Sequence, residues 1–212
     1  MIEVLVHHKG ISKSDAMREV LSMLDAVEIS DAKSRVSLYP HEFSGGMRQR
    51  IMIAMSLLCR PKLVIADETT TALDVTVQAQ IMALLAGMQK EFGMAVMLIT
   101  HDLGVVAGFC EEVLVLYGGQ VMEQGPVDPI FASPSHPYTR GLLNAIPRID
   151  AATDALETIP GSPPNSMLES RGCPFEPRCR HAHDICTDEM PALVPFAEHR
   201  LCACNRTVEE LV

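Results

Sequence analysis

Hydrophobic residues up to about Pro126 recur with a helical period in some stretches and form short unbroken runs in others. The helical period predicts helices after Ser12 or Ser14, after Ser44, and over residues 75–92 and 103–110. The unbroken runs at residues 63–66, 95–99 and 112–117 predict strands, the first two buried on both faces as in a parallel sheet. Because strands and helices alternate, we expect an α/β fold with right-handed crossovers.

The pattern changes after about Pro126, where prolines interrupt every longer periodic stretch. Pro160-Gly161-Ser162-Pro163-Pro164 has the composition of a linker, and the cysteines become dense beyond Gly172. We therefore divide the chain into a domain over residues 1–125 and an extension over 126–212, with a cysteine-rich segment at 172–204.

Composition narrows the classes of function. A hydrophobic content of 48% is enough for a real core, and the net charge of −10 argues against nucleic acid as the main partner. No apolar run approaches the roughly 18 residues of a membrane-spanning helix, and residues 1–10 lack the apolar region of a secretory signal. We therefore expect a soluble, cytoplasmic type of chain that reaches a membrane only through a partner.

Three polar groups stand where α/β proteins bind nucleotides. Ser44-Gly45-Gly46 begins a predicted helix, where free N–H groups and the helix dipole attract phosphate. Asp67 and Glu68 end one predicted strand, and His101 follows the next, which is the edge where such sheets place ligands. One of the two carboxylates can bind Mg²⁺, and the other can orient or deprotonate an attacking water. Taken singly, they are explained as well or better by an ordinary capped turn, by a carboxylate pair that is exposed to solvent or caps the next helix, and by a structural histidine. Their order together predicts a nucleotide site.

This ordered set resembles the ABC-type ATPases from Tyr39 to about Gln124. It implies the C-terminal portion of a P-loop NTPase fold, followed by a small appendage rich in cysteine and proline. The segments Leu38–Arg50, Thr71–Gln80 and Ser135–Leu143 are similar to the oligopeptide/dipeptide permease branch of that family.

The resemblance implies a role for each matching residue. Ser44, Gly45 and Gly46 correspond to the signature loop, which binds the γ-phosphate of an ATP held by the opposite subunit. Asp67 corresponds to the Walker B magnesium carboxylate, and Glu68 corresponds to the catalytic carboxylate. Asp74 matches the D-loop aspartate, and His101 matches the switch histidine. ATP and Mg²⁺ are the implied ligands.

Two features depart from the family. Thr69 stands where a proline usually follows the catalytic glutamate, so we expect a modest loss of backbone rigidity. No G-x-x-x-x-G-K-[ST] phosphate loop occurs in the sequence. In the family a strand accompanies this loop, and the resemblance places that strand, which is also missing here, inside the sheet. We therefore expect a truncated product or fragment, unstable alone and not competent for ATP, with unpaired sheet edges and exposed apolar faces.

The terminal cysteines predict a metal site. Four thiols with spacings of five, six and seventeen residues are enough for a metal ion or a cluster, although the spacing matches no common zinc finger or ferredoxin. The alternative is a proline-stiffened tail with reduced thiols. In relatives such a tail is associated with a [4Fe-4S] cluster, and the resemblance favours Cys173, Cys179, Cys186 and Cys204. Cys202 competes for the fourth position, and His181 and His183 are alternative zinc ligands.

The resemblance implies the ATP-hydrolysing subunit of an oligopeptide or dipeptide importer, peripheral to the cytoplasmic face of the bacterial inner membrane. Its partners would be a second ABC ATPase subunit in a head-to-tail dimer, transmembrane permease subunits and, indirectly, a peptide-binding protein. The main alternative is a non-catalytic subunit that lends only its signature loop to an intact ATPase. A metal-binding regulatory fragment is a third reading. ABC proteins of DNA repair fit less well, because they usually carry long coiled coils.

Overall fold

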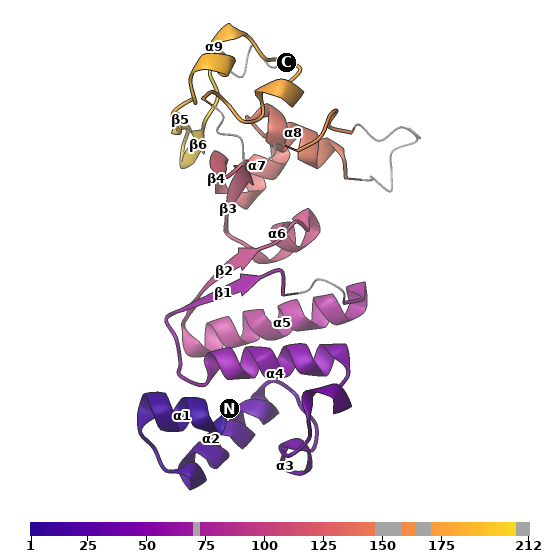
Figure 1. Ribbon diagram of the computed structural model, residues 1–212, viewed down its shortest axis with the longest axis vertical. Helices are drawn as coiled ribbons and strands as arrows, with labels where there is room; N and C mark the ends of the chain where they lie inside the picture. The colour runs from indigo at the N-terminus through magenta and orange to yellow at the C-terminus, as the bar shows by residue number, and fades with distance from the viewer. Residues whose placement is uncertain (70–72, 147–157, 164–170, 207–212) are drawn as a thin grey trace. The chain divides into compact units, whose positions relative to one another are not determined.

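The computed structural model describes residues 1–69, 73–146, 158–163 and 171–206, and its contacts divide the chain into two compact units (Figure 1). The first unit is Met1–Asp102 and the second is Leu103–Val212. The boundary predicted from sequence, after residue 125, falls inside a strand of the second unit.

Helices make up most of the first unit. Ser12 caps α2 by accepting a hydrogen bond from the backbone N–H of Asp15, so the predicted helix start is confirmed. Helix α2 contacts both α1 and α4, and α4 also contacts α5. Their shared core contains the fully buried side chains Leu5, Val20, Leu57 and Ile81. The helices are α1 (Ile2–Lys9), α2 (Lys13–Ala26), α3 (Ala32–Arg35), the short 3₁₀ helix η1 (Pro40–Glu42), α4 (Gly45–Leu57) and α5 (Val75–Phe92).

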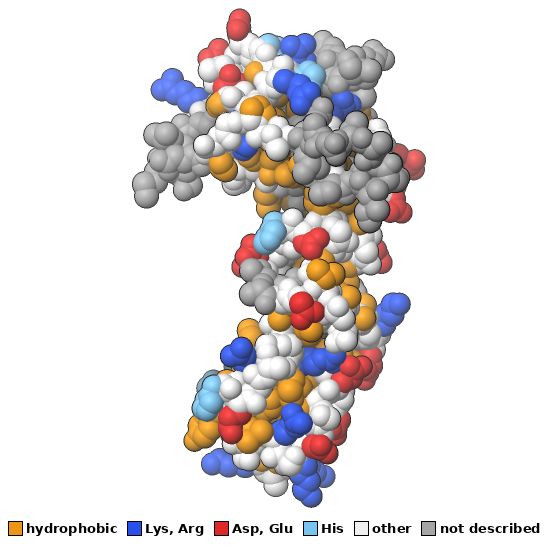
Figure 2. Space-filling view, turned by 90° about the vertical axis from the view of Figure 1, so that its right-hand side faces the viewer, with side chains coloured by type: hydrophobic (Ala, Val, Ile, Leu, Met, Phe, Trp, Pro, Cys, Tyr) orange, Lys and Arg blue, Asp and Glu red, His pale blue; other side chains and the backbone are white. Residues whose placement is uncertain are grey.

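The first unit also contains a two-stranded parallel sheet of β1 (Leu63–Asp67) and β2 (Ala95–Ile99), in a register that sets Asp67 opposite Ile99. Both strands were predicted correctly, but their burial on both faces was not. Ile65 and Met97, which are opposite each other, are 61% and 51% exposed. The reason is that, among the described residues, β1 and β2 pair only with each other and one face of the sheet has no cover. Hydrophobic side chains are accordingly visible at the surface (Figure 2).

The second unit is built on an antiparallel sheet in the order β3-β4-β6-β5. A turn at Gly118-Gly119, where both glycines have a positive φ, joins β3 to β4. The hairpin of β5 and β6 was not predicted. The elements are α6 (Leu103–Phe109), β3 (Glu112–Tyr117), β4 (Gln120–Pro126), α7 (Val127–Ala132), α8 (Pro137–Asn144), η2 (Glu176–Arg178), α9 (Asp184–Asp188), β5 (Val194–Ala197) and β6 (Arg200–Cys202).

A buried ion pair joins several of these elements. Arg200 Nη2 donates to Glu123 Oε1 at 3.0 Å, and both side chains are almost wholly buried. The same guanidinium nitrogen donates to the carbonyl oxygen of Ser133 and the hydroxyl of Ser135, at 2.6 and 2.8 Å. The pair therefore fastens β6 to β4 and to the loop before α8. Among the described helices, none is long and apolar enough to cross a membrane.

Candidate functional site

The carboxyl ends of β1 and β2 bring two predicted site residues together. The backbone N–H of Glu68 donates to the carbonyl oxygen of Ile99 at 2.9 Å, which continues the strand pairing by one residue. His101 Nδ1 then lies 3.2 Å from Glu68 Oε1, and both side chains are more than half exposed. The register places Asp67 in the same strand end, with its side chain also exposed. Three polar groups are thus gathered at one sheet edge, open to a ligand.

Glu68 has an unusual backbone. Its φ of +46° lies in the left-handed region, which residues other than glycine rarely adopt. Such conformations cluster at functional sites, where the surrounding structure holds them in place. The backbone of Glu68 pairs with Ile99, and its side chain contacts His101. These two contacts place the carboxylate at the sheet edge.

Asp74 begins α5 and is its N-cap. Asp74 Oδ1 accepts a hydrogen bond from the backbone N–H of Val77 at 2.9 Å. One turn further, the amide of Gln78 donates to the Asp102 carboxylate at 2.8 Å. The start of α5 is therefore tied to the segment that follows β2 and carries His101. Residues 70–72, which connect Thr69 to this helix, lie outside the described part of the chain.

The glycine pair predicted to bind phosphate lies against the same helix. Ser44 caps α4 by accepting from the N–H of Met47 at 3.3 Å, and Ser44 and Gly45 are exposed. A Cβ added to Gly46 would lie 2.9 Å from Cγ1 of Val77, so only glycine fits there without displacement. The exposed backbone at Ser44 and Gly45 leaves first-turn N–H groups available to an anion.

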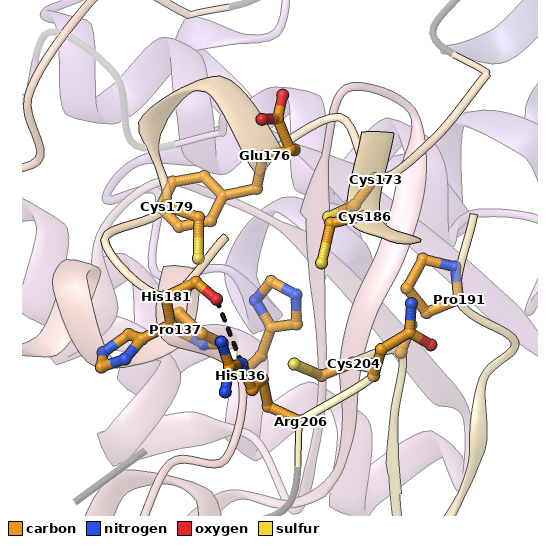
Figure 3. Close-up of a pocket in the computed structure, with 13 residues that line it drawn as sticks. His136, Pro137, Cys173, Glu176, Cys179, His181, Cys186, Pro191, Cys204 and Arg206 are labelled. Carbon is orange, nitrogen blue, oxygen red and sulfur yellow. Dashed lines mark hydrogen bonds between the residues drawn. The ribbon is translucent and has the colours of Figure 1, made fainter. Parts of the chain in front are cut away.

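The four terminal cysteines of the sequence prediction line one pocket in the second unit (Figure 3). They come from different segments. Cys173 precedes η2 and Cys179 follows it, Cys186 is on α9, and Cys204 follows β6. Cys202 does not line this pocket, because it sits in β6 opposite Glu123 and is buried there. Within the described residues, no three His, Cys, Asp or Glu side chains are close enough to hold a single metal ion.

Local backbone geometry sets these thiols around the pocket. The N–H of Cys173 donates to the carbonyl oxygen of Cys186 at 2.8 Å, which brings two of the segments together. This approach requires glycine at position 172, because a Cβ there would collide with the Cys186 carbonyl oxygen. The five-residue spacing to Cys179 is taken up by one turn of 3₁₀ helix, closed by Cys179 N–H donating to Glu176.

Burial favours the protonated form of two of the pocket thiols, Cys173 and Cys179. Burial raises the pKa of Cys179 to about 11, and the neighbouring cysteines add to the shift. Burial also raises the pKa of Cys173, and that of Cys202 further still. His181, another lining residue, has its pKa lowered by burial and by nearby arginines. A soft metal that binds these sulfurs must therefore displace protons.

Sequence reasoning missed His136, which lines the same pocket and is 2% exposed. Its Nδ1 accepts a hydrogen bond from the backbone N–H of Tyr138 at 3.0 Å, and so caps α8. Burial lowers the pKa of His136 to about 4, which keeps the ring neutral at pH 7. The available signal was a histidine directly before a proline at a helix start, but that pattern gives a cap and no hint of a pocket.

Comparison with known proteins matches both units. Residues 3–71 match the family described as "ABC transporter", and residues 122–186 match "Oligopeptide/dipeptide transporter, C-terminal region". The oligopeptide transport ATP-binding protein OppD of Salmonella typhimurium is 58% identical over 212 residues, all of this chain. The chain belongs to the ABC transporter ATP-binding family. Within it, the second match places the chain in the oligopeptide/dipeptide branch.

Other members of the family agree. OppD of Haemophilus influenzae is 55% identical over 99% of this chain, and a putative peptide import ATP-binding protein of Brucella ovis is 47% identical over 98%. The chain spans 63% of the length of the Salmonella protein. Among solved structures, cbiO1 of Clostridium perfringens, part of the ABC transporter complex cbiONQ, is 31% identical with a TM-score of 0.55. That likeness covers 62% of this chain and 51% of cbiO1, and agrees with a P-loop NTPase fold of the ABC type.

Proposed function

We propose that this chain is part of the ATP-binding subunit of an oligopeptide importer and supplies the catalytic and signature elements of its ATP sites. The observation that carries the proposal is the pairing of Glu68 with His101 at an exposed sheet edge, 3.2 Å apart. The curated relatives named above support the peptide-transport part, because they are oligopeptide transport or peptide import proteins.

Each residue at this edge has a task in the proposed reaction. Asp67 binds Mg²⁺ through its waters, and Glu68 orients and polarises the water that attacks the γ-phosphate. His101 contacts the γ-phosphate from the neighbouring strand, while Asp74 lies at the subunit contact. Ser44, Gly45 and Gly46 bind the γ-phosphate of an ATP whose phosphate loop belongs to the opposite protomer. In this reaction the chain positions the reacting groups and stabilises the negative charge on the phosphates.

The proposal includes a second ABC ATPase subunit, transmembrane permease subunits and, through them, a peptide-binding protein. The chain would then lie at the cytoplasmic face of the inner membrane, held there by its partners.

The sequence as it stands contains no phosphate loop, so we propose that this chain alone has no high-affinity site for MgATP. Titration calorimetry of the purified chain with MgATP should show no binding in the micromolar range. Micromolar affinity would contradict this part of the proposal.

Co-purification with an intact relative tests whether the signature loop completes a partner's site. We expect ATPase activity of the relative to rise in the presence of this chain, and Ser44→Arg to abolish the rise. Ser12→Arg is the matched control, because Ser12 is also a helix N-cap serine but belongs to α2. Equal loss with both variants, or no stimulation at all, would contradict the proposal.

Glu68→Gln in the same assay tests whether the chain contributes its catalytic carboxylate or only its signature loop. If the chain acts only through its signature loop, Glu68→Gln leaves the stimulation intact. Loss of stimulation by both Glu68→Gln and Ser44→Arg would mean that Glu68 acts on a nucleotide although the sequence has no phosphate loop, and it would contradict the proposal that this chain alone has no MgATP site.

We further propose that the cysteine pocket holds a [4Fe-4S] cluster, ligated by Cys173, Cys179, Cys186 and Cys204. The four thiols on one pocket support a soft, sulfur-ligated metal centre. Zinc would need these sulfurs within about 2.3 Å of a single centre. A cluster spreads its ligands over several irons.

Iron, sulfide and zinc analysis after anaerobic purification tests the cluster. We expect iron and sulfide with a visible absorption band that Cys204→Ser removes. Cys202→Ser should retain the band, because Cys202 lies outside the pocket. A colourless protein loaded with zinc, or loss of the band with Cys202→Ser alone, would refute this assignment.

A further inference from the structure

His136 is held in place from three directions inside the second unit. Its backbone N–H donates to Glu123 Oε2 at 3.0 Å, while Ser135 N–H donates to Oε1 of the same carboxylate at 2.9 Å. Its ring nitrogen Nδ1 accepts from the N–H of Tyr138. The ring of Phe175 lies beside the imidazole, with centroids 6.1 Å apart. Neither the backbone nor the ring of His136 is free to turn.

These contacts fix which nitrogen carries the proton. Because Nδ1 accepts a hydrogen bond, it is unprotonated, and the proton of a neutral imidazole must then be on Nε2. The neutral ring therefore has one hydrogen-bond donor left to offer, at Nε2.

The position of the ring indicates what this donor can reach. His136 lines the pocket formed by Cys173, Cys179, Cys186 and Cys204 and is 2% exposed, so its Nε2 edge faces that pocket and not bulk solvent. In Figure 3 the side chain of His136 lies among the labelled cysteines. Thiols are weak hydrogen-bond acceptors, whereas thiolates and sulfides bound to iron are good ones.

We propose that His136 is a positioning residue of this metal centre, whose Nε2–H donates a hydrogen bond to a cysteine or sulfide sulfur of the bound cluster. The inference rests on the proposed cluster. Outer ligand contacts of this kind orient a centre and set its affinity and potential. Because reduction adds negative charge to the cluster, a donor to sulfur stabilises the reduced form more and raises the reduction potential.

Two variants separate the hydrogen bond from the helix cap. In His136→Asn the short side chain keeps an oxygen near the position of Nδ1, so the cap on Tyr138 is kept and the pocket donor is lost. In His136→Gln the terminal amide reaches the position of Nε2, so the donor is kept and the cap is lost. A merely structural role for His136 predicts the larger effect in His136→Gln.

The experiment reconstitutes the full chain and both variants with ferrous iron and sulfide under anaerobic conditions. Iron retention against a chelator and the reduction potential of the loaded protein are then measured. We expect His136→Asn to weaken retention by about 10- to 100-fold and to lower the potential, with His136→Gln closer to wild type. The thermal unfolding of the metal-free proteins reports folding separately.

The outcomes distinguish this inference from the cluster itself. If the wild-type chain takes up no iron and sulfide, the cluster assignment fails and the role of His136 fails with it. If the wild type loads and His136→Asn matches it in retention and potential, the cluster stands and the inference about His136 is overturned. If His136→Asn does not fold, a wild-type potential in His136→Gln supports the donor, and a potential lowered in His136→Gln overturns it.

Discussion

Gly45 and Gly46 are neighbours in sequence at the start of α4, but they differ in the space around them. A Cβ at position 46 would meet the stiff, β-branched side chain of Val77 at 2.9 Å, whereas the nearest atom to a Cβ at position 45, on Leu73, is 3.7 Å away. Gly45→Ala should therefore gain helix propensity, by about 1 kcal/mol. Gly46→Ala should lose more than that through overpacking of about 1–3 kcal/mol. Chemical denaturation followed by circular dichroism measures both, and equal stability of the two variants would contradict the close packing of α4 on α5.

Asp74 has a structural task in addition to its proposed place at the subunit contact. Because its carboxylate accepts from the N–H of Val77, Asp74→Ala should destabilise the first unit by about 1 kcal/mol. Asp74→Asn keeps a capping oxygen and should stay near wild-type stability. Asp74→Asn therefore removes the charge of Asp74 without loss of folding. It can be used in the ATPase assay with an intact relative to test whether that charge matters. A stable Asp74→Ala would show that the cap contributes little.

Single residues show how far sequence reasoning reaches. The caps at Ser12 and Ser44 followed from local rules, because capping depends only on a few neighbouring backbone groups. Glu68 and His101 were expected at one edge of the sheet because each follows a predicted strand, whereas their direct contact was not predicted. The left-handed φ of Glu68 and the pocket position of His136 were not predictable, since both depend on contacts far along the chain.

The β5–β6 hairpin and β4 are joined by Arg200 and Glu123, and this contact belongs to the scale of elements. Removing one partner of a buried ion pair leaves the other charged and uncompensated, so Arg200→Leu should destabilise the second unit by about 3 kcal/mol. The exposed pair of Arg18 with Asp15 is the control, because Arg18→Leu should cost less than about 1 kcal/mol. Unfolding monitored by near-ultraviolet circular dichroism compares the two. A loss with Arg200→Leu no larger than with Arg18→Leu would mean that the hairpin is held by other contacts.

Elements with strong local periodicity were predicted, and those made by distant pairing were not. Helix α5 and the strands β1 to β3 follow from hydrophobic spacing, with ends correct to a few residues. The β5 and β6 strands are short, one contains Pro195, and their pairing with β4 joins positions far apart in sequence. Prolines there suggested an irregular tail, because the pattern rules weigh local breakers more heavily than a partner strand.

At the scale of the whole molecule, each unit has its own buried core and its own proposed chemistry. The first unit carries the proposed nucleotide-binding residues beside a sheet whose apolar face is exposed at Ile65 and Met97. The second unit packs Tyr117, Met122 and Phe175 around Cys173, so its core and its cysteine pocket share residues. Binding of the proposed metal centre would therefore be linked to the folding of the second unit, whereas the first unit contains one cysteine, Cys59.

That linkage gives a prediction for the intact chain. A metal centre that binds the folded second unit stabilises it by mass action, by about 2.7 kcal/mol when the free metal is a hundredfold above its dissociation constant. Anaerobic removal of the metal with a chelator should therefore lower the unfolding temperature reported by the tyrosine signal, because Tyr117 and Tyr138 both lie in the second unit beside Phe175. The helical signal comes largely from the first unit and should move less. Cys204→Ser should unfold at the chelated temperature with or without metal, while Cys202→Ser should keep the response. The predicted linkage would be contradicted if the unfolding temperature reported by tyrosine changed neither with the chelator nor with Cys204→Ser.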